Sequence, residues 1–287
     1  MKRGYIYSIV AAIMFGSAGI FVKLAYKVGL DSIDILIVQY IAAVILMFAL
    51  IFARNREALY IKRTQVFHLA VLGIFGTTLM TLFYYEAFKY LSVAMVTILL
   101  FTYPIMILIY SIIFRNQKIT FQKMMAVILS FAGCVLGLNV FNGSVDYTFK
   151  GIIFGLLSAV FYAFMNLYSE KNLQNIYSMT INAYSTLFSL ITLVIYRPPY
   201  FLLEDKINMK GILYIILLAV VTDVIPLTLL YASIKYIGAV KTSIIGNLEI
   251  PASIIISSIV LKERVYMAQI IGALMILCSV YIITQRK

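Results

Sequence analysis

The chain has few charged residues, no tryptophan, two cysteines and a single histidine. Only 12% of its 287 residues carry a charge, against roughly 25% in an average soluble domain. This shortage of charge excludes an ordinary water-soluble fold, because 63% of the residues are hydrophobic. Without Trp, the aromatic belts expected at a membrane interface must be formed by Tyr.

The few cysteine and histidine residues also exclude several kinds of chemistry. Cys134 and Cys278 each lie deep inside an apolar run, where a disulfide framework or a metal site would be out of place. We expect both to be small, buried packing residues. His68 lies near the start of an apolar run, and a lone interfacial His is more often solvated than part of a proton relay. Neither a metal nor a cofactor is expected, and the sequence does not predict an enzyme.

Long apolar runs separated by short polar gaps make up most of the chain. A helix that crosses a bilayer needs about 20 consecutive apolar residues. Ten such helices are predicted, near residues 4–24, 33–53, 66–88, 92–114, 121–141, 150–170, 178–196, 210–234, 239–261 and 265–284. The gaps leave no room for a soluble domain, and no Gly-rich Walker loop is present. The predicted fold class is an all-α polytopic membrane protein with ten transmembrane helices.

The formal charge of +12 comes from basic residues that flank the apolar runs. No compact basic stripe with stacking aromatics lies outside these runs, so nucleic acid is not an expected partner. In the first half, a cytoplasmic N-terminus would place inside the cell Lys2, Arg3, Arg54, Arg56, Lys62, Arg63, Arg115, Lys118 and Lys123. The residues left outside would be Lys23, Lys27 and Lys89. The second half favours neither orientation, so the first half predicts that both termini are cytoplasmic, in the cytoplasmic membrane.

The chain resembles itself at a shift of 146 residues. This shift aligns Tyr85, Lys89 and Tyr90 with Tyr231, Lys235 and Tyr236, and Pro104 matches Pro251 with a one-residue slip. Two copies follow, residues 1–143 and 144–287, each with five predicted helices. Because five is odd, the second copy must enter the membrane from the opposite side. Inverted repeats of this kind allow a central site to open alternately to the two sides of a membrane, as in many secondary transporters.

The repeated segments also resemble a known family. Each half has an Ala/Ser-x-Lys-Tyr-x-Ser/Gly segment followed by a helix with a central proline, and the best-matched stretch is Lys235 to Gly272, with Leu248-Glu249-Ile250-Pro251 and Lys262-Glu263-Arg264. These features resemble the EamA-type members of the drug/metabolite transporter superfamily over essentially the whole chain. The resemblance implies a ten-helix carrier of small metabolites. It also implies that helices three, four, eight and nine line a central cavity, whereas helices five and ten pack peripherally.

Two intramembrane carboxylates are the main candidates for substrate binding and proton coupling. A charge at the bilayer centre costs about 2.5 to 3.5 kcal/mol on insertion scales, so such a residue usually faces a cavity or a partner. Glu249 lies in the ninth helix near Asn247 and Pro251. A backbone carbonyl freed by the proline could bind a polar substrate together with the side chains of Glu249 and Asn247. Asp223 lies in the eighth helix three residues before Pro226, and its repeat partner is the neutral Thr77. Structural hydrogen bonding is the alternative for both carboxylates.

Further polar residues are predicted to line the cavity or to stabilise the helices. Substrate contacts are predicted for Gln39, Tyr84, Tyr85 and Asn166, and helix–helix hydrogen bonding explains each equally well. Structural roles are predicted for Pro104, Pro226 and Pro251 and for Glu86 and Lys89, which lie three apart and can neutralise each other. Small residues four apart, such as Gly133 and Gly137, permit close helix contacts and allow a homodimer.

Two functional hypotheses remain open from the sequence alone. The first is a secondary transporter, with export favoured, that moves a small polar metabolite such as an amino acid or an amine by alternating access and with proton coupling. Its partners would be the small-molecule substrate and the lipid bilayer. The alternative is a non-transporting membrane assembly or regulatory subunit.

Overall fold

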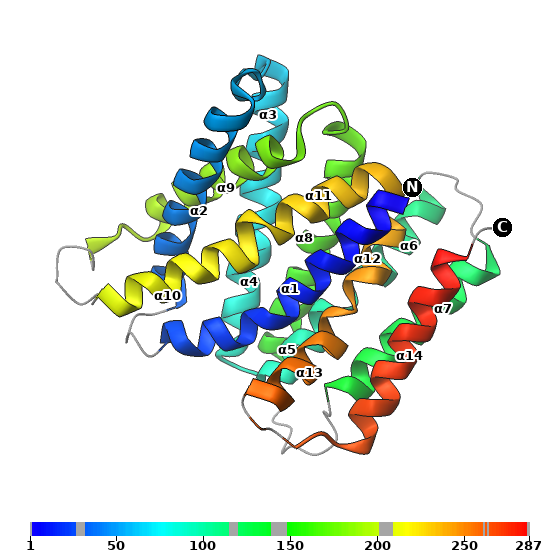
Figure 1. Cartoon of the computed structure of the whole chain (residues 1–287). Coiled ribbons are helices and arrows are strands. Elements are labelled where there is room, and N and C mark those ends of the chain that lie inside the picture. Colours follow the sequence, from blue (N-terminus) through cyan, green and yellow to red (C-terminus); the bar gives the residue numbers. More distant parts are fainter. Residues whose placement is uncertain are drawn as a thin grey trace.

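The computed structural model describes residues 2–26, 32–114, 120–138, 148–200, 209–260, 262 and 264–285. Within these ranges the chain is helical and forms no strand (Figure 1). The first half contains α1 (Lys2–Tyr26), α2 (Ser32–Arg54), η1 (Arg56–Leu59), α3 (Arg63–Val71), η2 (Leu72–Thr78), α4 (Leu79–Phe88), α5 (Val93–Leu100), α6 (Tyr103–Ile113) and α7 (Phe121–Gly137). The second half contains α8 (Phe149–Asn172), α9 (Ser178–Tyr196), α10 (Met209–Ala219), η5 (Val220–Val224), α11 (Pro226–Ile237), α12 (Ala239–Gly246), α13 (Glu249–Val260) and α14 (Met267–Thr284).

The helices have the length and composition of membrane spans. Eight helical stretches in the described part of the chain are long and apolar enough to cross a bilayer: Ile33–Arg54, Arg63–Phe88, Ala94–Ile113, Phe149–Asn172, Ser178–Tyr196, Gly211–Ile237, Ala239–Val260 and Met267–Thr284. Phe121–Gly137 is a shorter apolar helix. Many large apolar side chains, such as Ile45, Ile195 and Leu274, remain exposed on the outside of the bundle. A multi-pass, all-α membrane protein, as predicted, accounts for this outer surface.

Two of the predicted helices contain a π-helical segment at matching places in the two halves. The shift of 146 residues places η2 over residues 218–224, which include all of η5. In η5 the amide of Ile225 donates to the carbonyl of Val220 (3.2 Å), directly before Pro226, which has no N–H to donate. In η2 no proline follows, and the Thr78 hydroxyl donates to the carbonyl of Gly73 (2.9 Å). Different local bonds therefore stabilise the same irregularity.

The predicted fourth and ninth helices are each broken near their middle. The first break separates α5 from α6 at residues 101–102, and the second separates α12 from α13 at residues 247–248. Each break is followed within three residues by a proline, Pro104 or Pro251, in the first turn of the next helix. A first-turn proline leaves no bond unmade, because the N–H groups there have no intrahelical acceptor. The breaks make Tyr103 and Glu249 the first residues of α6 and α13.

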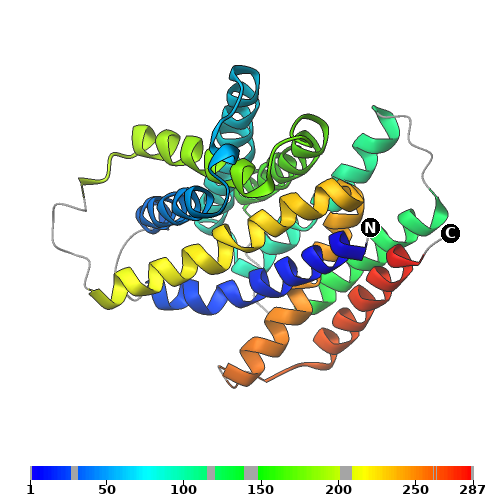
Figure 2. The same cartoon turned by 45° about the horizontal axis from the view of Figure 1, so that its top comes forward.

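Helix contacts in one half have counterparts in the other. α1 packs against α11, α12 and α13, and α8 packs against α4, α5 and α6. Close approach at the helix starts is matched as well: a Cβ at Gly4 would collide with Tyr236 and Ile237, and one at Gly151 with Tyr90 and Leu91. α2 packs against α9 on one side of the bundle (Figures 1 and 2).

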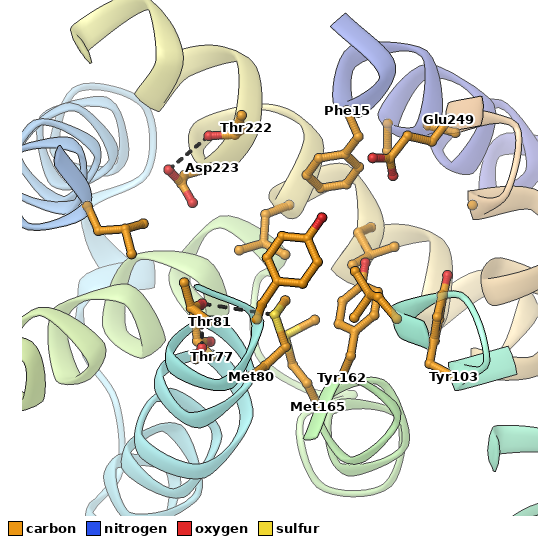
Figure 3. A pocket seen from close by; sticks show the side chains of 18 of the residues that line it. Phe15, Thr77, Met80, Thr81, Tyr103, Tyr162, Met165, Thr222, Asp223 and Glu249 are labelled. Carbon is orange, nitrogen blue, oxygen red and sulfur yellow. Dashed lines mark hydrogen bonds between the residues drawn. The ribbon is translucent and has the colours of Figure 1, made fainter. Parts of the chain in front are cut away.

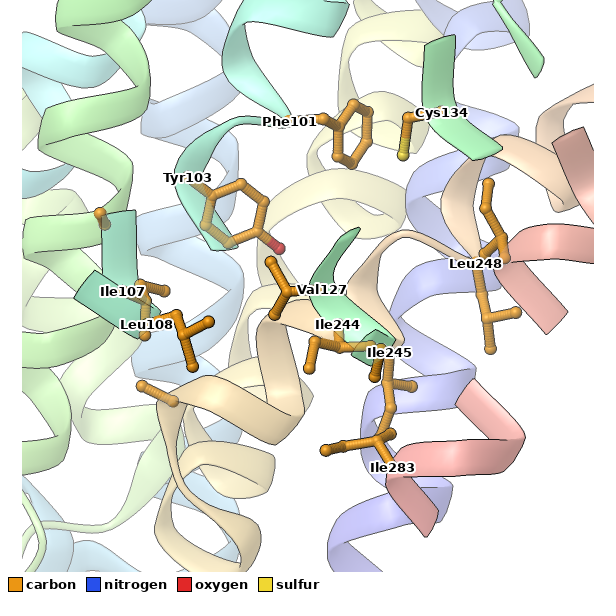
Figure 4. Packing of buried hydrophobic residues seen from close by; sticks show 14 of the residues in the cluster. Phe101, Tyr103, Ile107, Leu108, Val127, Cys134, Ile244, Ile245, Leu248 and Ile283 are labelled. Atoms are coloured by element: carbon orange, nitrogen blue, oxygen red, sulfur yellow. The ribbon is translucent and has the colours of Figure 1, made fainter. Parts of the chain in front are cut away.

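α7 and α14 form a tightly packed pair at the periphery (Figure 1). A Cβ at Gly272 would collide with backbone atoms of Gly133 and Gly137, so the two helices touch along their backbones. Cys134 is buried in the adjoining cluster with Phe101, as predicted (Figure 4). The prediction that Cys278 is buried is wrong, because this residue lies on the exposed face of α14.

Candidate functional site

A cavity of about 220 Å³ lies in the centre of the bundle. Its walls come from both halves and include α1, α2, α4, α8 and η5, together with both broken helices. Among the described residues, α7 and α14 contribute none to the lining, in agreement with the peripheral position that the family resemblance implies. The polar and aromatic lining residues are Ser8, Phe15, Gln39, Tyr40, Thr77, Thr81, Tyr84, Tyr85, Phe101, Tyr103, Tyr162, Thr222, Asp223 and Glu249.

Asp223 occupies one side of the cavity and is held by several donors. Gln39 and Thr222 both donate to its Oδ2 atom, the hydroxyl of Thr222 at 3.2 Å. The amide of Gln39 also contacts the Thr222 hydroxyl at 2.9 Å, which closes a three-residue network. Asn182 donates to the backbone carbonyl of Asp223 (2.7 Å) and to Thr228 (3.0 Å). Side-chain and backbone oxygens of Asp223 are thus fixed from α2, α9 and its own helix.

Glu249 occupies the opposite side of the cavity (Figure 3). It is the first residue of α13 and is partly buried, yet no residue of the described chain forms a hydrogen bond or an ion pair with its carboxylate. Phe15, Tyr103 and Tyr162 lie around it in Figure 3. A desolvated carboxylate without a protein partner is costly, and a ligand or a proton would satisfy it.

Aromatic rings separate and surround the two carboxylates. Tyr103 and Tyr162 pack with their ring centroids 4.4 Å apart, and the Tyr103 hydroxyl donates to the carbonyl of Ser243 (3.1 Å). On the other side Tyr84 and Tyr85 pack edge to face at 6.1 Å. Among the described residues, the cavity lining includes two acidic side chains and no Lys, Arg or His. An acidic cavity with aromatic walls suits a cation, because carboxylates and ring faces both attract positive charge.

The structure brings together five of the seven residues predicted to contact substrate. These are Gln39, Tyr84, Tyr85, Asp223 and Glu249.

Two predicted contacts, Asn247 and Asn166, lie outside the cavity lining. Asn247 donates to the hydroxyl of Ser130 (2.7 Å) and joins α12 to α7. Asn166 donates to the carbonyl of Tyr162 one turn earlier (2.8 Å). Both side chains are buried, the Asn247 amide in a bond between two helices and the Asn166 amide in a bond within α8.

The residues with predicted structural roles are found outside the polar network. Lys89 and Glu86 form an ion pair of 2.6 Å at the end of α4, where the Lys89 side chain is 62% exposed. Pro104, Pro226 and Pro251 lie in the first turns of α6, α11 and α13. They position the starts of these helices without lining the cavity.

Sequence reasoning did not assign a site role to Tyr40, Thr222, Tyr103 or Tyr162. Tyr40 lies next to Gln39, and its hydroxyl is 3.4 Å from that of Thr81 across the α2–α4 contact. The shift of 146 residues aligns Tyr103 with Glu249, and this repeat relation is the sequence signal that could have pointed to Tyr103. Tyr162 and Thr222 carry no such signal, because a Tyr or Thr in an apolar helix is common.

One ion pair ties α2 to α9 away from the cavity. Arg197 follows the last residue of α9 and lies 3.0 Å from Asp34, near the start of α2. At the other end of the same two helices, Thr180 and Tyr184 donate to the carbonyls of Ala58 (2.9 Å) and Leu59 (2.8 Å). α9 is therefore connected to α2 at one end and, at the other, to η1, which directly follows α2.

The sequence matches a known transporter family in both of its halves. The model of the EamA-like transporter family matches this chain twice, over residues 2–138 and 149–285. The chain belongs to the EamA-like transporter family, and the family domain is present in two copies.

Curated relatives extend over nearly the whole chain. An uncharacterized transporter of Bacillus subtilis, YcbK, is 26% identical over 281 residues, covering 94% of this chain and 88% of the relative. An uncharacterized transporter of Clostridium kluyveri is 23% identical over 96% of this chain and 91% of its own length. A solved crystal structure with 15% identity superposes with a TM-score of 0.80 over 99% of this chain and 97% of the other, which shows a shared fold. The family match and these relatives make the protein a membrane transporter.

Proposed function

We propose that the protein is a secondary transporter that exports a small polar metabolite bearing an amine across the cytoplasmic membrane. The observation that carries this proposal is Glu249, whose carboxylate has no bonding partner in the described chain. It faces a cavity with aromatic walls and no basic residue among the described lining residues. An ammonium group would supply the missing charge and hydrogen bonds. The opposite carboxylate, Asp223, already accepts bonds from Gln39 and Thr222.

The proposed architecture is ten membrane helices arranged as two inverted repeats of five. α1 and α7 complete the count beyond the eight stretches that meet the length and composition criteria. Support comes from the paired contacts of α1 and α8, from the two π-helical segments and from the two broken helices. Two similar halves with opposite orientation can exchange conformations around a fixed central site, which is alternating access.

Proton coupling is proposed to use the same two carboxylates. Removal from water disfavours the charged form of a carboxyl group, so a proton can replace the ammonium cargo at Glu249. Exchange of one proton for one ammonium group leaves the net charge of the cavity the same in both half-cycles, so Glu249 never crosses the cycle as an uncompensated charge. Export then follows when protons enter as the amine leaves.

The test is amine transport by the purified chain in liposomes with an imposed pH gradient. Wild type is compared with Glu249→Gln and Asp223→Asn, and Glu86→Gln is the matched control because its carboxylate lies outside the cavity. A panel of amino acids and amines is offered, together with carboxylic acids of similar size. We expect gradient-driven movement of an amine by wild type and by the control. For Glu249→Gln we expect a loss of about ten-fold or more, because a charge-assisted hydrogen bond is worth roughly 1.5 to 3 kcal/mol.

Two results would contradict the proposal. Equal transport by wild type and Glu249→Gln would remove Glu249 from the mechanism. Failure of the folded wild type to move any amine, with or without a gradient, would favour the assembly or regulatory subunit.

A further inference from the structure

A second, larger hollow lies on the outside of the bundle. It has a volume of about 640 Å³ and is formed by α3, α6 and α8. Its apolar wall consists of Met106, Ile109, Tyr110 and Phe114 on the α6 side and Val160, Ala163, Phe164 and Leu167 on α8. Ile109 and Val160 are 48% and 45% exposed, so the hollow opens toward the surroundings of the bundle and not toward the central cavity.

The polar residues of this groove are confined to one end. Lys171 and Asn172 are the last two residues of α8, and His68 lies in the last turn of α3. The Nδ1 atom of His68 and the hydroxyl of Tyr168 are 2.7 Å apart, which fixes both rings at the groove wall. Lys171 is exposed and forms no ion pair or hydrogen bond with the described residues. The groove is therefore amphipathic along its length.

The dimensions of the groove suit a single extended chain. The groove extends over eleven residue steps on α8, from Val160 to Lys171, and over eight on the α6 side, from Met106 to Phe114. At a rise of 1.5 Å per residue, it is about 12 to 16 Å long. This is about half of the roughly 30 Å hydrocarbon core, or one leaflet. Dividing the 640 Å³ volume by about 14 Å gives a mean cross-section of roughly 46 Å², or about 7 Å across, which is narrower than the diameter of a second helix, about 10 to 12 Å.

We propose that this groove, formed by α3, α6 and α8, binds an anionic phospholipid. One acyl chain lies between Ile109 and Val160, and the phosphate headgroup lies at Lys171 beside His68 and Tyr168. A lipid supplies both parts that the groove requires, an apolar chain of one-leaflet depth and a negative charge at its polar end. The ends of α6 and α8 and the start of α3 are on the side that the basic residues predict to be cytoplasmic, where anionic lipids are concentrated. The proposal does not depend on transport.

The test uses the purified full-length chain in detergent with added lipid. Retained lipid is counted by native mass spectrometry, and the thermal unfolding midpoint is measured with phosphatidylglycerol, with phosphatidylcholine and with inorganic phosphate alone. We expect phosphatidylglycerol to bind and stabilise the protein more than phosphatidylcholine does. Phosphate alone should do neither, because it lacks the acyl chain.

Two variants with matched controls locate the site. Lys171→Gln should weaken phosphatidylglycerol binding about five-fold, since one basic residue near an anionic headgroup contributes about 1 kcal/mol; Lys123→Gln, on the same predicted side but outside the groove, should not. Val160→Phe narrows the groove and should reduce binding of both lipids. Ile153→Phe, two turns earlier on α8 and 40% exposed, should leave binding unchanged.

Equal binding of the two lipids by wild type would overturn the headgroup assignment, and unchanged binding by Val160→Phe would overturn the groove assignment. Stabilisation by inorganic phosphate alone would identify a phosphate site without a lipid and would also overturn the proposal.

Discussion

Glu249 and Asp223 are two carboxylates of one cavity with different surroundings. Asp223 accepts bonds from Gln39 and Thr222, whereas Glu249 has no such partner among the described residues. A bonded carboxylate holds its position and a carboxylate without partners can exchange ligands. At the residue scale the proposed division of labour is therefore that Asp223 shapes the cavity and Glu249 binds the cargo.

The Gln39 amide provides a direct test of the position of Asp223. In Gln39→Leu the Asp223 carboxylate loses one hydrogen-bond donor, and the bond from the Gln39 amide to the Thr222 hydroxyl is lost as well. Because a buried group left unsatisfied costs roughly 1 to 3 kcal/mol, we expect a lower thermal unfolding midpoint together with weaker amine transport. Gln174→Leu is the control, since Gln174 is exposed and bonds within its own helix turn. An unchanged midpoint for Gln39→Leu would show that the network does not hold Asp223.

Tyr103 separates the role of a ring from the role of a hydroxyl. Tyr103→Phe removes the bond to the carbonyl of Ser243 but keeps the ring against Tyr162. We expect the thermal unfolding midpoint to fall while the transport KM for the amine stays within about two-fold, because the ring beside the cargo is kept. Tyr103→Leu should raise the KM, since cation–π attraction of about 0.5 to 2 kcal/mol is lost. Equal KM values for the two variants would contradict a role for the ring.

At the element scale, the π-helical segment η5 depends on a residue of another helix. Asn182 of α9 donates to the carbonyl of Asp223 inside η5. Asn182→Ala leaves this buried carbonyl without its side-chain donor, so we expect destabilisation of about 1 to 3 kcal/mol, measured by thermal unfolding in detergent. Asn172→Ala is a suitable comparison, because that amide bonds only within α8 at 3.3 Å and lies at the helix end. A similar loss in both variants would argue against a special requirement of η5.

The α7–α14 pair tests the importance of backbone contact. Gly272→Leu places a side chain where the backbones of Gly133 and Gly137 lie, so the helices must separate. We expect a severe loss of folded protein, measured by size-exclusion profile and thermal unfolding. Cys278→Leu on the exposed face of the same helix should stay within about 0.5 kcal/mol of wild type. A well-folded Gly272→Leu protein would show that the contact is not required.

The helices were predictable from the sequence to a greater extent than their interruptions. Apolar length located the spans because a bilayer enforces it. Pro226 and Pro251 indicated disturbed turns in the second half. No proline comes directly after η2, so this π-helical segment was not predictable from composition. Asn247 and Glu249 lie two residues apart across a helix break, so they face different surroundings, α7 and the cavity. Polarity alone could not distinguish those two directions.

On the scale of the whole molecule, orientation follows from the basic residues of the first half. Both termini are predicted to be cytoplasmic, so fluorescent-protein fusions at either end should fluoresce in cells. A cysteine at Lys150, at the start of α8, should be labelled by an impermeant maleimide added outside. A cysteine at Arg56, in η1, should be labelled only after the membrane is opened. Labelling in the reverse pattern would invert the proposed topology and with it the direction assigned to export.

The two π-helical segments carry information about the history of the chain. Each adds a residue to a helical turn at equivalent places, η2 and η5, although the residues that satisfy the local bonds differ. When two helices share a π-helical turn but stabilise it with different hydrogen bonds, the simplest explanation is that both inherited the turn. The extra residue was then already present in a half-length ancestor, before gene duplication and fusion. If the halves are inverted as proposed, that ancestor worked as a pair of identical chains inserted in opposite directions, and the difference between Thr77 and Asp223 arose after the copies were joined.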